Sequence, residues 1–577
     1  MSEEMPEPQD RVARPRRRPR RPRGVGVPAD PAAWRTTGVV AGIAALLVVG
    51  GLFVPAPSAD DDPAGAVEPV DSSLAICPEP GSVDGGRTTS AITVVPDLPG
   101  QEREGEASIA LLRGAAAADD SPAADVVVAG DLVSPGDAAE VVAEQTRLPA
   151  LEVRTQGGLA PGLVASQVTQ DSFSASRGLA SQPCLGPDTT WWFVGGGSTA
   201  GRDSDLVLVN PEETPADVEV SISGPDGVVT TPQLRGLVVE PRSRIVVKLS
   251  REAPRLPAAA WRVTVRQGRV VAALSDKQTE GFVPQGADWI PASADPSTRV
   301  LIPGVIGGPG GRQLLVHAPG DLAATVRVRL ITTGGSFVPQ AASEVEVPAG
   351  AVVAVDLDEA LQGEDATVDL QSDVPIVAGV RQRHPGLDAT KGSLEETSFT
   401  AGAVPIVDVA AVTGLQAARG TSVTVWVTVP DEIITIESAA DMPGMDAEMS
   451  ASPDAMADDT PTDAVTPPAD DTASKAVSVT LRVLPAAPGE PTPPMPDPIT
   501  LSVAPGRLVA VTIPRPAGAS WLTVVAEVSG GEAVIAHRLL RRNEDGSLVT
   551  GYPWLPLRTT VVVPRAVPDP GLAVPGE

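Results

Sequence analysis

The stretch DLVLVNP at residues 205–211, followed by ADVEVSI at residues 216–222, decides the fold class of this chain. Polar and apolar residues alternate in the second run, and this period of two is typical of β-strands with one buried face, while the first run is a short apolar stretch that ends at Asn-Pro. Similar runs rich in Val, Ile and Thr continue to residue 274, and turns such as GPDG at 224–227 separate them. About seven short strands per 100 residues are typical of a β-sandwich.

The same order of strands recurs twice further along the sequence. QLLVH at 313–317 and TVRVRL at 325–330 belong to one copy, and SVTVWV at 422–427 and VSVTLRV at 477–483 belong to the next. This duplication predicts an all-β fold of tandem immunoglobulin-like sandwiches, arranged as a rod, rather than one large barrel. Less regular runs nearer the N-terminus predict a fourth, divergent sandwich. The predicted sandwiches cover residues 75–187, 188–298, 299–400 and 401–558, and a C-terminal extension covers residues 559–577.

The composition excludes two classes of protein. With 43 Lys and Arg against 73 Asp and Glu, the 577-residue chain has a formal net charge of -30, whereas a nucleic-acid-binding protein needs a basic face to displace counterions from phosphates. The 3 His and 2 Cys are too few for a zinc ribbon or a cysteine-rich scaffold. With 61 Pro, 56 Gly and 3% aromatic residues, the chain suits short strands and turns rather than long helices.

The N-terminal segment has the pattern of a membrane anchor. Residues 1–35 carry nine Arg against five acidic residues and are predicted to form a disordered cytoplasmic tail. The uncharged run TTGVVAGIAALLVVGGLF at 36–53 would be about 27 Å long as a helix, which predicts a transmembrane helix over 36–54. Because Lys and Arg stay on the cytoplasmic side, the rest of the chain is expected outside, after an acidic, Pro-containing linker over 55–74. A signal peptide cleaved before Ala59 is the alternative.

Cys77 and Cys184 would both lie outside the membrane in this topology. That compartment is oxidising, and an even number of cysteines favours a disulfide. A bridge would close a loop of more than 100 residues and contribute up to about 4–5 kcal/mol in the chain-entropy model. We therefore predict a Cys77–Cys184 disulfide that links the two ends of the first sandwich, with two separate thiols as the alternative.

The last repeat contains an interruption at residues 438–474. This segment is rich in acidic residues, Ala and Pro without a strand period, so it cannot bury enough apolar area to offset the entropy of ordering. It is predicted to be a disordered insertion. Its thioethers are candidate ligands for a soft ion such as Cu(I), although scattered methionines with no His or Cys nearby are the plainer explanation. These methionines are Met442, Met445, Met449 and Met456.

The main aromatic cluster is Trp191, Trp192 and Phe193, which Gly195–Gly197 follow closely. Buried aromatic side chains anchor a core, whereas exposed ones stack on sugars or on partner proteins. A core anchor is the favoured interpretation. A ligand or partner surface is the alternative, because the cluster lies at a junction between two predicted domains, where ligand clefts tend to form.

Catalytic motifs are missing from the sequence. The chain has no Gly-x-Ser-x-Gly, no His-Glu-x-x-His and no P-loop. His317, His384 and His537 fall in or beside strands of different repeats, which favours structural roles. We therefore expect no enzymatic activity and no resident metal or cofactor.

Six segments carry a resemblance to a known family. They are RGLA at 177–180, CLGP at 184–187, WWFVGGG at 191–197, LVLVNP at 206–211, ADV at 216–218 and RTTVVVP at 558–564. In this order they resemble an uncharacterised family of membrane-anchored or secreted cell-envelope proteins of high-GC Gram-positive bacteria, whose domain has no known function. The resemblance implies an envelope protein of several β-domains and supplies no catalytic residues.

These features together predict a single-pass plasma-membrane protein whose extracellular part binds or scaffolds components of the cell envelope. A carbohydrate-binding accessory to wall or exopolysaccharide assembly is the first alternative, and a hydrolase within residues 75–187 is the second. The expected partners are the membrane and either cell-wall polymer or envelope proteins, and not nucleic acid.

The topology can be tested on intact cells. Protease added outside should remove the acidic part of the chain and leave residues 1–54 protected, because the Arg-rich tail stays in the cytoplasm. Fusions of a compartment-specific reporter to the C-terminus check the same point. Reporter activity in the cytoplasm would contradict this topology.

Overall fold

The computed structural model describes residues 66–79, 86–113, 127–143, 148–172, 176–385, 395–431, 476–543 and 546–563. The described part is nearly all-β, as predicted. Its helical elements are short: α2 (Leu249–Glu252), α3 (Asp358–Leu361) and the 3-10 turns η2 (Pro232–Leu234) and η3 (Gln340–Ala342). Residues Val67–Val562 form one compact unit, to which this description applies. The transmembrane prediction over 36–54 and the insertion 438–474 lie outside the described residues. Within the described residues, none of the helices is long and apolar enough to cross a membrane.

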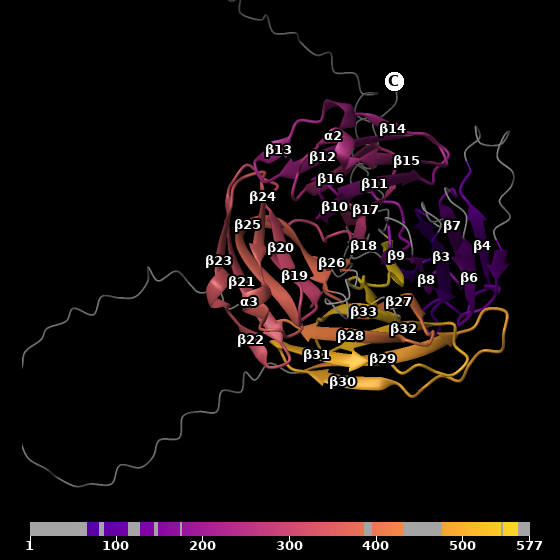
Figure 1. The fold of residues 1–577 in the computed structure, drawn as a ribbon. Helices are drawn as coiled ribbons and strands as arrows, with labels where there is room; N and C mark the ends of the chain where they lie inside the picture. Colours follow the sequence, from indigo (N-terminus) through magenta and orange to yellow (C-terminus); the bar gives the residue numbers. More distant parts are fainter. Residues whose placement is uncertain are drawn as a thin grey trace, which may run out of the picture. The chain divides into compact units, whose positions relative to one another are not determined.

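The strands of the compact unit fall into four modules, each with two sheets (Figure 1). The first module covers residues 72–183 and the second covers residues 190–290. The sheets of the first are β2 (Ser72–Cys77), β7 (Leu151–Gly157), β4 (Gly105–Leu111), and β5 (Val127–Ala129), β6 (Ala138–Ala143), β3 (Arg87–Val94), β8 (Leu163–Asp171), β9 (Gly178–Pro183). Those of the second are β10 (Thr190–Val194), β16 (Ala260–Gln267), β12 (Ala216–Gly224), β13 (Gly227–Val229), β14 (Leu237–Val239), and β15 (Ser243–Lys248), β11 (Arg202–Asn210), β17 (Val271–Glu280), β18 (Val283–Ile290).

The third module covers residues 297–401 and the fourth covers residues 409–550. In the third, the long β25 (Ala366–His384) takes part in both sheets, with β19 (Ser297–Val305), β21 (Ala324–Thr332), β22 (Gly335–Phe337), β23 (Glu344–Val347), and with β24 (Val352–Asp356), β20 (Arg312–His317), β26 (Glu396–Ala401). The fourth has β27 (Val409–Gln416), β32 (Trp521–Ser529), β29 (Val477–Ala486), β30 (Ile499–Val503), and β31 (Arg507–Thr512), β28 (Thr421–Val429), β33 (Val534–Asn543), β34 (Gly546–Thr550).

One strand order repeats in all four modules. The opening strand of each module (β2, β10, β19, β27) pairs with β7, β16, β25 or β32, which in turn pairs with β4, β12, β21 or β29. The facing sheets have the orders β6-β3-β8-β9, β15-β11-β17-β18, β24-β20-β25-β26 and β31-β28-β33-β34. The module with the least regular sequence therefore has the same topology as the other three.

Each pair of sheets encloses one apolar core. In the second module, Val218, Val220 and Ile222 of β12 share a core with Leu206 and Leu208 of β11. The alternating positions of β12 are less buried, which is the burial pattern that period-two sequences produce. Comparable cores lie in the first, third and fourth modules.

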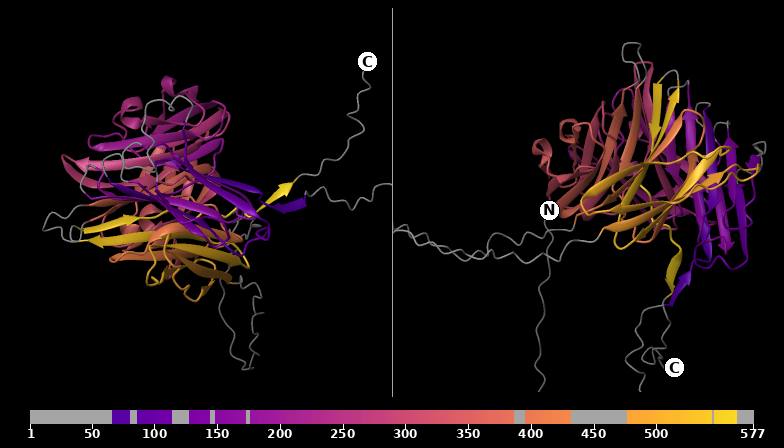
Figure 2. Two further views of the ribbon diagram at one scale, coloured as in Figure 1. Left: turned by 90° about the vertical axis from the view of Figure 1, so that its right-hand side faces the viewer. Right: turned by 90° about the horizontal axis from the view of Figure 1, so that it is seen from below.

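Three expectations differ from the structure. The region predicted as a linker, 55–74, contains β1 (Ala66–Pro69) and the start of β2, and the predicted extension 559–577 contains β35 (Thr560–Val563); β1 and β35 pair as a two-stranded ribbon (Figure 2). Among the strands that were not predicted are β9, β18, β26 and β34. Lastly, the first module contacts the fourth through β9 and β34, and such a contact between first and last module does not fit a rod.

A partly buried ion-pair network joins the third and fourth modules shortly before the insertion. The guanidinium group of Arg299 donates to both carboxylate oxygens of Asp369, at 3.1 and 2.9 Å, and to the backbone oxygen of Asp431 at 2.9 Å. The Asp431 carboxylate also accepts hydrogen bonds from Arg329 at 3.0 Å and from the Ser336 hydroxyl at 2.5 Å. Asp431, the last described residue before the insertion, is therefore bonded to the third module.

This network gives a matched pair of stability tests. Deleting 438–474 should leave the melting temperature nearly unchanged, because Asp431 is retained and the cost of closing a loop grows only as about (3/2)RT ln n. Asp431→Ala should lower the free energy of unfolding by roughly 0.5–1.5 kcal/mol, because it removes the partly buried carboxylate that accepts hydrogen bonds from Arg329 and Ser336. Thermal denaturation of both variants checks this. A larger loss from the deletion than from Asp431→Ala would mean that the insertion contributes to the fold.

Candidate ligand-binding site

The last strands of the four modules meet one another in the middle of the compact unit. β18 packs against β9 and β26, and β34 packs against β9 and β26 (Figure 1). Their sequences, GLASQP, VPQGADWI, ETSFTA and GSLVT, contain many small and polar residues. Such strands suit a place where polar side chains bridge neighbouring sheets.

The carboxylate of Asp288 is the centre of these contacts. Its Oδ1 accepts hydrogen bonds from the backbone N–H of Ser181 at 3.1 Å, the Thr550 hydroxyl at 3.0 Å and the N–H of Trp289 at 2.9 Å. Ser181 and Thr550 also hydrogen-bond to each other at 2.7 Å. One buried carboxylate thus connects the second module to the first and the fourth.

Two carboxyl groups in this centre have raised pKa values. Burial raises the pKa of Asp288 well above its ordinary value, and the hydrogen bonds from Trp289, Thr550, Ser181 and the Phe399 backbone only partly oppose this effect. Burial likewise raises the pKa of Glu396, which the nearby Arg177 guanidinium opposes.

Glycines make room for the buried Glu396. A Cβ at Gly286, whose φ is +101°, would clash with the backbone N of Thr397 and approach Oε1 of Glu396 to 2.7 Å. A Cβ at Gly178 would meet the backbone oxygen of Ala287 at 2.6 Å. The strands of the first, second and third modules therefore approach closely only because these positions lack side chains.

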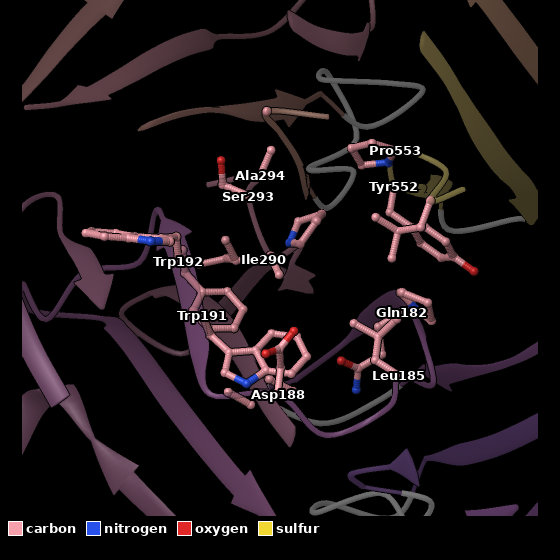
Figure 3. Close-up of a pocket in the computed structure, with 18 of the residues that line it drawn as sticks. Gln182, Leu185, Asp188, Trp191, Trp192, Ile290, Ser293, Ala294, Tyr552 and Pro553 are labelled. Carbon is pink, nitrogen blue, oxygen red and sulfur yellow. The ribbon is translucent and has the colours of Figure 1, made fainter. Parts of the chain in front are cut away.

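A pocket of about 360 Å³ lies where β9, β18, β26 and β34, which we call the central strands, come to an end (Figure 3). The residues that follow β9, β18, β26 and β34 form its wall, and we call them the exit segments: residues 184–189, 291–296, 402–408 and 551–558. The second and third exit segments are joined by the backbone hydrogen bond from Ala294 N–H to Gly402 O, and Ser293 N–H donates to Trp192 O of β10; both bonds are 2.8 Å long. All four modules contribute to this single cavity.

The pocket wall is mainly apolar. Small side chains in the wall leave room for the cavity, and larger apolar side chains surround it. The small ones include Ala272, Ala273, Ala292 and Ala403, and the larger ones include Leu185, Ile290, Pro291, Tyr552, Pro553 and Leu555. The polar groups are few: Gln182, Asp188, Ser293 and Asp295 are among them. An apolar cavity with a few polar groups is typical of sites for small ligands.

The predicted disulfide is present and lies directly beside the pocket wall. Cys77 and Cys184 are bonded, and both side chains lie in the core of the first module. Their neighbours Pro78 and Leu185 line the pocket, and the N–H of Ile76 donates to the oxygen of Leu185 at 2.8 Å. The bridge therefore holds the first exit segment against β2.

Trp191, Trp192 and Phe193 are buried in β10, with exposed fractions of 8%, 5% and 1%. The indole N–H of Trp191 donates to the backbone oxygen of Val270 at 3.0 Å, and the guanidinium of Arg262 lies 5.1 Å from the Trp192 ring centroid. All three residues also border the pocket. They serve as core anchors and provide no exposed platform for stacking.

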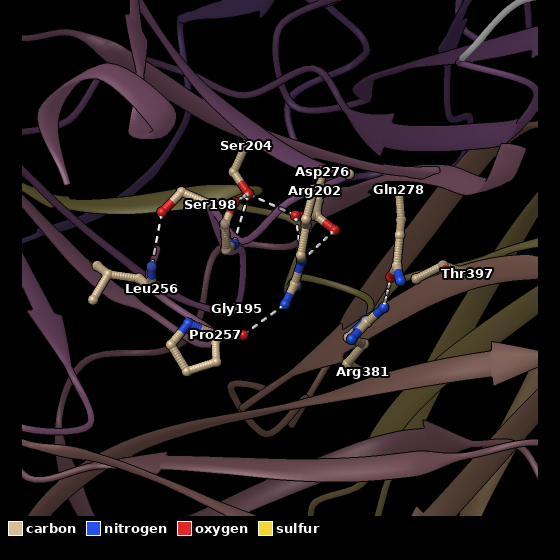
Figure 4. Close-up of polar contacts among 12 residues, drawn as sticks. Gly195, Ser198, Arg202, Ser204, Leu256, Pro257, Asp276, Gln278, Arg381 and Thr397 are labelled. Carbon is tan, nitrogen blue, oxygen red and sulfur yellow. Dashed lines mark hydrogen bonds and ion pairs between the residues drawn. The ribbon is translucent and has the colours of Figure 1, made fainter. Parts of the chain in front are cut away.

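The glycine-rich segment after Phe193 supports a buried ion pair (Figure 4). The N–H of Gly197 donates to the Ser204 hydroxyl at 2.8 Å, which in turn donates to Asp276 at 2.5 Å. Asp276 also accepts from Nε of Arg202 at 3.0 Å. Since Ser204 already uses this N–H, the segment acts as structural support rather than as a phosphate cradle.

The three histidines lie at separate places. His317 bonds to the backbone oxygen of Ala351 at 2.9 Å, and His384 bonds to the Ser398 hydroxyl at 2.9 Å. Burial lowers the pKa of His317, and it lowers those of His384 and His537 to about 3. The methionines of the insertion lie outside the described residues. Among the residues described, no three His, Cys, Asp or Glu side chains are grouped closely enough to hold a metal ion.

Neither the central strands nor the pocket formed by the exit segments was predicted from the sequence. A recurrent signal was nevertheless present, because each module ends with a Pro-containing run: QPCLGP, IPASADP, AGAVP and GYPWLP. Proline cannot continue a central strand, so each run marks the point where the chain leaves the centre.

A family of unknown function, DUF5719, matches residues 138–468, which is more than half of the chain. The chain therefore belongs to this family. The match extends from β6 of the first module into the insertion of the fourth. None of the curated proteins matches the chain.

The buried Asp288 predicts a pH dependence of stability. Because its pKa is higher in the folded than in the unfolded state, the stability that its proton contributes is complete below about pH 4 and is lost as pH rises through the folded pKa. Asp288→Asn keeps an accepting oxygen and removes the titration. Relative to the parent, it should gain on the order of 1 kcal/mol between pH 5 and pH 8. Urea unfolding at both pH values tests this, with the exposed Asp226→Asn as control; an equal shift in both variants would refute it.

Proposed function

We propose that this member of a family of unknown function is a membrane-anchored binding protein of the bacterial cell envelope, whose extracellular part holds a small ligand in the pocket at the exit segments. The observation that carries this proposal is that one apolar cavity receives wall residues from all four modules. Sheet packing alone would not require the modules to converge on an open space. A cavity of this size and lining suits an apolar molecule.

The proposed location follows from the N-terminal pattern and from the disulfide. The Arg-rich tail and the uncharged run at 36–53 support an anchor with the ectodomain outside. The Cys77–Cys184 bridge is consistent with an oxidising compartment. Within this proposal the four modules are immunoglobulin-like sandwiches that act as the frame of the pocket.

Binding is favoured over catalysis by the groups in the pocket. Its wall contains no Lys, Arg, His or Cys that a neighbouring carboxylate could activate, and Asp188 and Asp295 are exposed. The paired acids Asp288 and Glu396 are fully buried in the centre and lie outside residues 75–187, the region considered for a hydrolase.

A carbohydrate-binding role has less support. Sugar sites present aromatic rings at the surface. Among the described aromatic residues, those that are exposed are Phe282 and Phe337, and all the described Trp and Tyr side chains are buried. We therefore favour a small apolar ligand over a wall polysaccharide.

Filling the pocket tests the proposed function. The neutral fluorophore N-phenyl-1-naphthylamine should bind the full-length protein, and Ala292→Phe should weaken binding at least about tenfold, because the new ring occupies the cavity. Ala323→Phe at an exposed position is the matched control. Fluorescence titration measures both, with empty nanodiscs as the blank. Equal binding by the Ala292→Phe variant and the parent would refute a ligand site in this pocket.

A further inference from the structure

The charged residues of the pocket are all acidic. Asp188 belongs to the first exit segment and Asp295 to the second; both are exposed, and no cationic side chain lines the cavity. Oδ1 of Asp188 accepts the N–H of Thr189 at 2.6 Å. Figure 3 shows Asp188 beside the indole of Trp191, at one side of the apolar wall.

The wall also contains polar groups without partners. Gln182 is only 8% exposed, and its amide nitrogen has no hydrogen-bond partner. The hydroxyl of Ser293 likewise has none. Both atoms are enclosed by protein and do not face the cavity, so the exposed carboxylates of Asp188 and Asp295 are the groups that a polar end of a ligand can reach.

The carboxylates of the wall determine which charge on a ligand is favoured. The chain has a formal net charge of -30, and carboxylates beside low-dielectric walls concentrate cations. Opposite charges attract more strongly near a protein surface than in bulk water, because the effective dielectric constant is lower there. An anionic ligand would meet repulsion of the same size with no cation in the wall to offset it.

We propose that the pocket binds a small apolar amine, whose hydrocarbon body fills the cavity and whose ammonium group lies against Asp188 and Asp295. This inference rests on the proposed function of the pocket and adds the chemical class of the ligand. The indole of Trp191 can contribute further, because an aromatic face attracts cations.

Three probes of equal shape separate charge from apolar burial. They are 2-cyclohexylethylamine, 2-cyclohexylethanol and cyclohexylacetate, which share a ring and differ in charge at neutral pH. Titration calorimetry and saturation-transfer NMR on the full-length protein should show the amine bound about tenfold more tightly than the alcohol, and the acid more weakly than the alcohol. Raising the salt concentration should reduce the advantage of the amine, because exposed charges are screened.

Isosteric variants assign the effect to the two carboxylates. Asp188→Asn combined with Asp295→Asn should bring the affinity for the amine down to that for the alcohol and leave the alcohol unchanged. Asp226→Asn removes an exposed charge far along the chain, in the turn between β12 and β13, and should change none of the three affinities. Equal binding of acid and amine, or an advantage of the amine that survives in the double variant, would overturn the inference.

The alcohol distinguishes failure of this inference from failure of the proposed function. If the alcohol binds and Ala292→Phe abolishes that binding, the pocket is a ligand site whatever the order of the charged probes. If the alcohol does not bind, or binds equally to Ala292→Phe, the pocket itself is not a ligand site and both proposals fail.

Discussion

A carboxylate buried among four sheets has to receive hydrogen bonds from its neighbours, and Asp288 imposes this constraint on the whole unit. Its donors come from Ser181 in the first module and Thr550 in the fourth, in addition to its own strand. A buried polar group without hydrogen-bond partners costs about 1–3 kcal/mol, so the three strands keep their register around Asp288. The paired hydroxyls of Ser181 and Thr550 add a direct contact between the first and fourth modules. This polar centre contrasts with the apolar cores inside the modules, which hold each pair of sheets together without involving the other modules.

The modules could be predicted from the sequence because their cores follow a simple period. Val218, Val220 and Ile222 alternate with polar residues, and this pattern records one buried and one less buried face. The central strands have no such alternating pattern, because neighbouring modules cover both of their faces and many of the side chains that meet there are polar. ETSFTA in β26 is buried at every position, yet it contains Glu396 and three hydroxyl side chains, so its composition is that of a loop. Long-range pairing of this kind leaves no alternating pattern in these strands, and only the prolines that follow them mark where they end.

The candidate site could be predicted in part. Trp191, Trp192 and Phe193 were identified as a cluster at a domain junction, and all three border the pocket while serving as core anchors. The disulfide was predicted correctly from the number of cysteines and the proposed compartment. The other walls come from segments hundreds of residues apart, such as those with Pro183 and Pro553, which become neighbours only when the first and fourth modules meet. Asp188 and Asp295 are ordinary among 73 acidic residues until the structure places both beside one cavity.

The position of the pocket links ligand binding to contact between the modules. The exit segments continue directly from the strands that surround Asp288, so a shift of β18 would move Ile290 and Pro291 in the pocket wall. A ligand that touches all four segments has its full set of contacts only when the modules are together. Its binding free energy then adds to the stability of that arrangement, as for any ligand that binds one state preferentially. The raised pKa of Asp288 acts on the same equilibrium, because loss of its proton charges the centre and weakens the folded arrangement. Two contributions therefore stabilise the same arrangement of four modules. Protonation of Asp288 stabilises the contacts between the central strands, and a bound ligand stabilises the contacts between the exit segments.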